Sequence, residues 1–234
     1  MTQNQNRVTK ALFAAVFVSA ILPFIPILHW VLLPFDYLNT HVHEAFHALA
    51  AVGSGGETLR IEVYANSEGV TFTRGGIAPL IQSAGYIGAS LLGALMIASS
   101  KSVESARKWL TGLGIALAVI MVLWVRGDMV GISIGVFWTA LLLIGSRKLN
   151  KDVILFAVQF LGVQQCLNSL KSLRDLVYLS ASGDARTDAA ALAESTHLPA
   201  TFWAVLWGVI GFASMAVAVY RATSHQPPAK SLTM

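Results

Sequence analysis

The stretch from Asn39 to Ala51 reads NTHVHEAFHALAA and sets three histidines and one glutamate in a mostly apolar run. His43, Glu44 and His47 form the pattern His-Glu-x-x-His. On an α-helix, residues four positions apart project from the same face one turn apart, so both imidazoles can reach one ion. Glu44 then lies beside that ion, where a carboxylate can act as a general base toward water. The stretch therefore predicts a metal site on a helix.

The composition places this helix in a membrane protein. Of the 234 residues, 55% are hydrophobic and only 12% are charged, and the mean hydropathy is +0.64. A soluble domain carries about a quarter charged residues. Several apolar runs approach the roughly 20 residues that a helix needs to cross a bilayer. We therefore expect an all-α polytopic membrane protein with about six to seven transmembrane helices, in contact with the lipid bilayer.

The few polar and charged residues exclude other classes of protein. The net charge of +4 comes from Lys and Arg in short connections and tails, which is typical of topology signals and not of a nucleic-acid binder. The single cysteine, Cys166, excludes an internal disulfide framework and a cysteine-based zinc knuckle. The first apolar run continues to Pro34, longer than the apolar core of a secretion signal, so we expect a retained first helix.

Seven apolar segments are expected within a single domain over residues 1–234. Their approximate ranges are 11–33, with a kink at Pro23 and Pro26, and then 35–52, 77–99, 109–125, 129–144, 153–179 and 201–220. Three other stretches are a hairpin insertion at 55–75, a polar loop with a short helix at 180–200, and a disordered tail at 222–234. In the polar loop, Thr187 is the expected N-cap of a helix over residues 188–195.

The insertion has the pattern of a small β-hairpin between the second and third segments. Residues 60–64 and 70–73 alternate and are rich in β-branched and aromatic side chains, and ANSEG between them is typical of a turn. Two interpretations remain open. The hairpin can receive an extended peptide by strand addition, or it can be a solvated hairpin with no partner.

Zinc suits the predicted site, because it accepts two histidines and a carboxylate and leaves a fourth position for water. A glutamate in the middle of a membrane helix is costly unless it is paired or hydrated, so Glu44 indicates function. The alternative is a pair of interfacial histidines at a helix end, with Glu44 reaching out to water. His41 lies on another face of the helix and is expected at the interface or behind the ligands.

The third ligand is expected to be an acid from a later segment. Gln164, Asn168, Lys171 and Asp175 are spaced to draw one polar stripe along an otherwise apolar helix. Such a face turns inward, toward other polar groups or a hydrated cavity. Asp175 is therefore the leading ligand candidate, and Asn168 is a candidate for orienting substrate or stabilising an oxyanion.

Two alternatives to Asp175 as a ligand stay open. Lys171 and Asp175, four residues apart, can form a plain structural ion pair. Asp188, and after it Asp184, both in the loop that follows, are the next candidates for the third ligand.

The basic residues do not agree on a membrane orientation. In a seven-segment arrangement most of them fall on one side, which the positive-inside rule makes cytoplasmic and which leaves the N-terminus outside. These residues are Lys101, Arg107, Lys108, Arg147, Lys148, Lys151, Arg221 and Lys230. Arg7 and Lys10, near the N-terminus, favour the opposite orientation.

Several motifs together resemble the site-2 proteases, a family of intramembrane zinc metallopeptidases. His-Glu-x-x-His is followed by AVGSGGETLRIEVYANSEGVTFTRGG, which resembles the membrane-associated hairpin of that family, and then by SAGYIGASLLGA and a late TDAAALAESTHLPATFWAVLW. The likeness is to the small bacterial peptidase-like branch and extends from about Phe35 to Trp207. The resemblance implies that His43 and His47 bind zinc and that Glu44 is the catalytic base.

The family takes its third ligand from an aspartate in a Leu-Asp-Gly setting on a later helix. The nearest match here is SLRDLVY, in which Asp175 is followed by Leu176 in place of glycine. The glycines of GYIGASLLGA, namely Gly85, Gly88 and Gly93, are expected to let helices approach closely around a buried site.

The expected activity is that of an intramembrane zinc metalloprotease of the bacterial cell membrane. It would hydrolyse a peptide bond in or near a transmembrane segment of a membrane protein substrate, with Glu44 moving the proton. The alternatives are a membrane-embedded metal-binding or transport protein and a catalytically inactive scaffold.

Overall fold

The structure is a computed structural model that describes residues 3–25, 29–168, 170 and 187–224. Its elements, in chain order, are α1 (Gln3–Ile21), the 3-10 turn η1 (Leu22–Phe24), α2 (His29–Gly53), β1 (Glu57–Val63), β2 (Gly69–Arg74), α3 (Ala78–Ser99), α4 (Val103–Leu123), α5 (Met129–Lys148), α6 (Lys151–Asn168), α8 (Asp188–Thr196) and α9 (Ala200–Thr223). The predicted tail at 222–234 lies largely outside the described residues.

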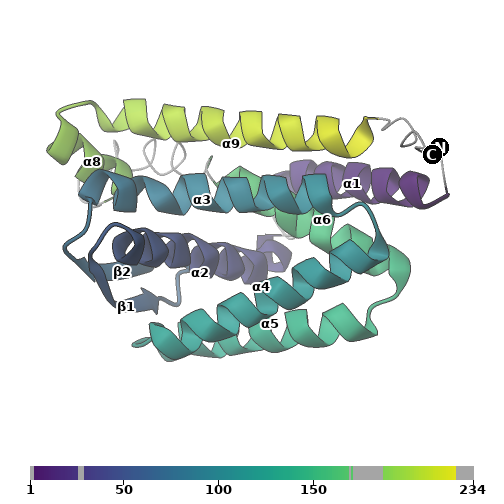
Figure 1. The fold of residues 1–234 in the computed structure, drawn as a ribbon, viewed down its shortest axis with the longest axis horizontal. Helices are drawn as coiled ribbons and strands as arrows, with labels where there is room; N and C mark the ends of the chain where they lie inside the picture. Colours follow the sequence, from purple (N-terminus) through teal and green to yellow (C-terminus); the bar gives the residue numbers. More distant parts are fainter. Residues whose placement is uncertain (1–2, 26–28, 169, 171–186, 225–234) are drawn as a thin grey trace, which may run out of the picture.

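The helices form an elongated bundle with two different ends (Figure 1). The hairpin of β1 and β2 and the short helix α8 lie at one end. The start of α1 lies at the other, where the Asn4 side-chain amide donates to the carbonyl of Lys101 at 2.9 Å. Helix α3 packs against α2, α6 and α9, so it runs through the middle of the assembly.

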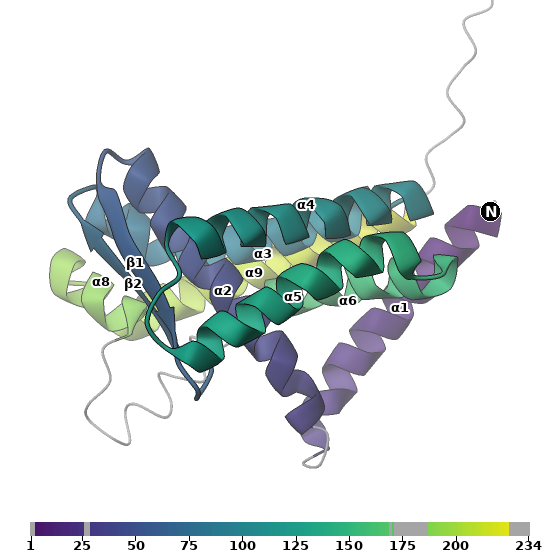
Figure 2. The same cartoon turned by 90° about the horizontal axis from the view of Figure 1, so that it is seen from below.

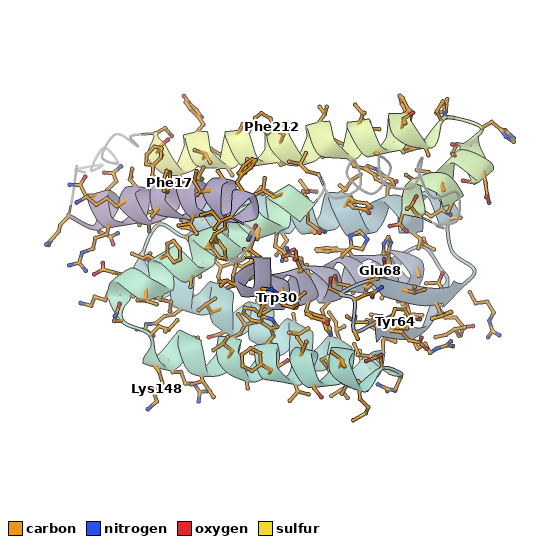
Figure 3. All side chains as sticks on the ribbon, turned by 180° about the vertical axis from the view of Figure 1, so that it is seen from behind. Phe17, Trp30, Tyr64, Glu68, Lys148 and Phe212 are labelled. Carbon is orange, nitrogen blue, oxygen red and sulfur yellow. The ribbon has the colours of Figure 1, made fainter. Side chains whose placement is uncertain are left out.

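Four of the described helices, α3, α4, α5 and α9, are long and apolar enough to cross a membrane. The expected count of six to seven is therefore not confirmed. Large apolar side chains such as Phe17, Trp30 and Phe212 lie on the outside of the bundle, as lipid contact requires (Figure 3). In contrast, α2 and α6 contribute buried polar side chains to the interior, among them Asn39 and Gln165, which are joined by a 2.6 Å hydrogen bond.

The prediction of one kinked segment over residues 11–33 was wrong. Helix α1 ends at Ile21, η1 follows, and a separate helix α2 begins at His29, so that the two helices diverge at this break (Figure 2). Pro23 cannot donate a backbone hydrogen bond, and such a residue ends or kinks a helix. Helix α2 continues through Pro34, whose carbonyl accepts a hydrogen bond from the Trp138 indole at 2.7 Å.

The predicted hairpin between α2 and α3 is confirmed. Strands β1 and β2 are antiparallel, with Ile61 opposite Thr71 and Val63 opposite Gly69. The buried side chains of Ile61 and Val63 pack against α2 and the turn after α4. The backbone of Ile61 is also bonded to Trp124 and Arg126 at 2.8 and 2.9 Å, on the side of β1 away from β2. The hairpin is thus docked on the bundle and is not a free loop.

The expected role of the glycines on α3 is also confirmed. A Cβ at Gly88 would overlap the ring of Phe46 on α2, and a Cβ at Gly93 would overlap the backbone carbonyl of Gly162 on α6. Because a carbonyl on a neighbouring helix cannot rotate away as a side chain can, the α3–α6 approach depends on Gly93. These contacts hold α2 and α6 at the distance that the site requires.

Candidate active site

The three residues of the motif converge inside the bundle. His43, Glu44 and His47 are 9%, 5% and 5% exposed, and their ligand atoms all lie within 4.8 Å of one another. The two imidazoles meet edge to face, with ring centroids 4.6 Å apart and the Nε2 atoms 2.9 Å apart. Helical spacing alone produces this pairing, as predicted. The alternative of interfacial histidines at a helix end does not fit, because the side chains are buried.

Asp188 brings a carboxylate to the same point from the far end of the chain. Its Oδ2 lies 3.2 Å from Nε2 of His43 and 3.3 Å from Nε2 of His47. Asp188 is the first residue of α8, and the hydroxyl of Thr187 accepts from the backbone N–H of Ala190 at 3.1 Å, so the predicted N-cap is confirmed. Burial favours the neutral acid, but the neighbouring imidazoles outweigh it and hold the pKa of Asp188 below its usual range.

Asp175, Asp184 and Lys171 lie outside the described residues, so the ligand role of Asp175 and its alternative ion pair remain predictions. Of the expected polar stripe, Asn168 is buried and Gln164 is partly buried.

Groups behind the imidazoles orient both rings. The Nδ1 atom of His47 lies 2.5 Å from the carbonyl of Ile81 on α3, so Nδ1 donates to that carbonyl and Nε2 is the ring atom left to bind an ion. The Asn168 amide lies 3.3 Å from Nδ1 of His43. An amide carries both a donor nitrogen and an acceptor oxygen, so Asn168 can offer its oxygen to an Nδ1–H in the same way. Asn168 thus contacts a ligand candidate, and its expected role toward substrate stays a prediction.

His41 does not join this centre, as expected from its place on another face of α2. Of the two places expected for it, the interface does not fit, because the side chain is 1% exposed. Its Nδ1 donates to the carbonyl of Tyr37 at 2.8 Å, and its ring faces Gly135 on α5, where a Cβ would lie 2.9 Å from Nε2. The missing side chain at Gly135 makes room for this imidazole.

The hairpin forms the wall beside Glu44. The hydroxyl of Thr71 on β2 lies 2.7 Å from Oε2 of Glu44, and a Cβ at Gly69 would lie 2.8 Å from Oε1. The sequence pattern identified the hairpin but not this contact, since nothing local marks one strand threonine as the partner of a distant glutamate.

Helix α3 closes the site on the side of the Nε2 atoms. A Cβ at Gly85 would lie 2.5 Å from Nε2 of both His43 and His47, so only glycine leaves the space in front of them open. The next residue, Tyr86, meets the ring of His43 edge to face at 4.4 Å and stacks on Trp207 of α9 at 4.8 Å. Both aromatic residues are buried, and the sequence pattern did not single them out.

The donor set fits zinc. Four ligands placed tetrahedrally at about 2.0–2.1 Å from zinc lie about 3.3 Å from one another. The separations of Asp188 Oδ2 from the two imidazole nitrogens are 3.2 and 3.3 Å, and that between the nitrogens is 2.9 Å. Two oriented imidazoles and one carboxylate, with Glu44 beside them, match the three protein ligands and the general base of a catalytic zinc centre.

Apolar helices around a buried histidine–carboxylate centre define a membrane protein of the metallopeptidase type. The sequence model of the Peptidase M50B-like family matches residues 11–218, and the chain belongs to that family. The resemblance to the site-2 proteases is thereby confirmed. No curated protein and no solved structure matches the chain.

We predict that Gly85→Ala abolishes zinc binding. The added methyl group would occupy the space in front of both Nε2 atoms. Zinc content of the purified protein, measured by elemental analysis, should fall from about one ion per chain to near zero. Gly53→Ala is the matched control, because a Cβ there meets nothing within 4 Å. Full zinc content in Gly85→Ala would show that the ion does not bind between these histidines.

Proposed function

We propose that this chain is a multi-pass intramembrane zinc metalloprotease that hydrolyses a peptide bond in or near a transmembrane segment of another membrane protein. One observation carries the proposal: the Nε2 atoms of His43 and His47 and the carboxylate of Asp188 converge beside Glu44. Membership of the Peptidase M50B-like family supports the reaction class. The likeness to the small bacterial branch supports a place in a bacterial cell membrane.

We propose Asp188 as the third zinc ligand, in place of Asp175. Its carboxylate is the one that lies within 3.3 Å of both imidazoles among the residues that the structure describes. As the first residue of α8 it sits on an ordered backbone, held by the Thr187 cap. A ligand on a capped helix is held in place before the ion arrives.

In the proposed reaction Glu44 moves the proton. A zinc ion, when bound, supplies the Lewis acidity that polarises a peptide carbonyl and acidifies water. Glu44 lies within 4.8 Å of both imidazoles, where its carboxylate can accept a proton from water and later pass it to the leaving amine. Ile81 and Asn168 keep the rings of His47 and His43 in the orientation that leaves the Nε2 lone pairs available.

The substrate must reach this centre in an extended form. A helix protects its peptide bonds with its own hydrogen bonds, so the segment to be cut must first unwind. Strand β2 is suited to hold it, because the outer side of β1 is already bonded to Trp124 and Arg126 at Ile61. This favours strand addition over a hairpin without a partner.

We predict that Glu44→Gln keeps zinc and loses proteolysis. Glutamine preserves the size of the side chain but cannot accept a proton, so cleavage should fall at least about 100-fold. Fluorescently labelled casein, an unfolded protein with extended apolar segments, is the probe, and the purified full chain in detergent is the enzyme. Zinc content is measured on the same samples.

The outcomes separate the three candidate functions. Wild-type protein that binds zinc and cleaves casein, with cleavage lost in Glu44→Gln, supports the protease. Zinc binding without cleavage in either form would favour a metal-binding or transport protein. Wild-type protein that holds no zinc would favour an inactive scaffold.

We predict that Asp188→Asn lowers zinc content and that Asp175→Asn does not. Asparagine keeps the shape of the side chain and removes the negative charge that pairs with the ion. The measurement is zinc retained by each purified variant after dialysis against a weak chelator. Retention of zinc by Asp188→Asn and its loss from Asp175→Asn would assign the third ligand to Asp175.

A further inference from the structure

We propose that Thr71 is a positioning residue for Glu44, so that the hairpin fixes the position of the carboxylate that transfers the proton. The proposal rests on the proposed function, because it assigns Glu44 the role of general base. It adds a residue that acts on the chemistry from a strand outside the motif. Thr71 is 27 residues away from Glu44 in the sequence.

The contact between the two residues is short and partly buried. The hydroxyl of Thr71 lies 2.7 Å from Oε2 of Glu44 and 3.0 Å from the backbone carbonyl of the same residue. A hydroxyl donates one proton, and an ionised carboxylate is the stronger acceptor. In the described part of the chain, Thr71 provides the side-chain hydrogen bond that the Glu44 carboxylate receives.

Gly69, on the same strand as Thr71, also restricts the Glu44 side chain. Residues two apart in a strand face the same side, so Gly69 and Thr71 both face α2. A Cβ at Gly69 would lie 2.7 Å from Cγ of Glu44, so β2 packs closely against the methylene groups of this side chain as well as its carboxylate. A glutamate has several rotatable bonds, and these two contacts restrict it to one arrangement near the imidazoles.

The same strand is the one that the proposed function assigns to the substrate. A peptide added to β2 would therefore order the strand that holds Glu44. Substrate docking and placement of the proton acceptor are then coupled through a single residue. This coupling predicts an effect on turnover that exceeds any effect on binding.

The test compares Thr71→Val, which removes the hydroxyl at constant shape, with Thr71→Ser, which retains it. With labelled casein, Thr71→Val should lower kcat about 10-fold at unchanged KM and zinc content, and Thr71→Ser should restore kcat to within about threefold of wild type. Thr58→Val is the matched control, because the Thr58 hydroxyl also ties the hairpin to α2, at the carbonyl of Ala48. An equal loss in Thr58→Val and Thr71→Val, or no rescue by serine, would overturn the proposal.

A binding measurement separates this proposal from the proposed function. Acetohydroxamate binds zinc and shares a proton with a neighbouring carboxylate, so its affinity for the zinc-loaded protein reports where Glu44 lies. Thr71→Val should weaken it about 10-fold. If wild type fails to cleave casein, the protease proposal fails, and an unchanged acetohydroxamate affinity in Thr71→Val would still overturn the role of Thr71.

Discussion

The pairing of two imidazole nitrogens in an apolar interior is the constraint on which the other elements depend. Nε2 of His43 and Nε2 of His47 lie 2.9 Å apart, both turned toward Asp188. Polar atoms taken out of water are costly unless they are bonded, so each ring needs a partner on its far side as well. Ile81 on α3 and Asn168 on α6 supply those partners. The histidine pair on one turn of α2 therefore requires α3, α6 and α8 to lie close to it.

Such a centre requires unusually close helices, and glycine makes them possible. At Gly85 the absence of a side chain leaves the space in front of the histidines open, and at Gly93 it lets α3 touch the backbone of α6. In lipid there is little hydrophobic gain from pressing helices together, so close packing and hydrogen bonds carry the association. The apolar residues on the outside can vary in identity as long as they stay apolar, whereas these glycines cannot.

The elements that were predicted correctly are those governed by neighbours in the chain. Thr187 caps α8, and the turn at residues 65–68 closes the hairpin, because caps and turns depend on a few adjacent residues. The first segment was misjudged for a related reason. The sequence stays apolar across Pro23, but helix α1 ends at Ile21, because a proline cannot continue the hydrogen bonds of the helix. Between the two places expected for His41 the sequence could not choose, because its burial depends on Gly135, far along the chain.

By itself the sequence determined the histidine pair and the adjacent glutamate, because helical periodicity acts over a single turn. It also determined the apolar helices and the hairpin, which follow from local patterns of side chains. Only the tertiary structure brought Asp188 to a histidine 145 residues earlier and set Thr71 against Glu44. Contacts of that kind depend on how loops close and helices cross, and no local pattern encodes the distance between two residues on different elements.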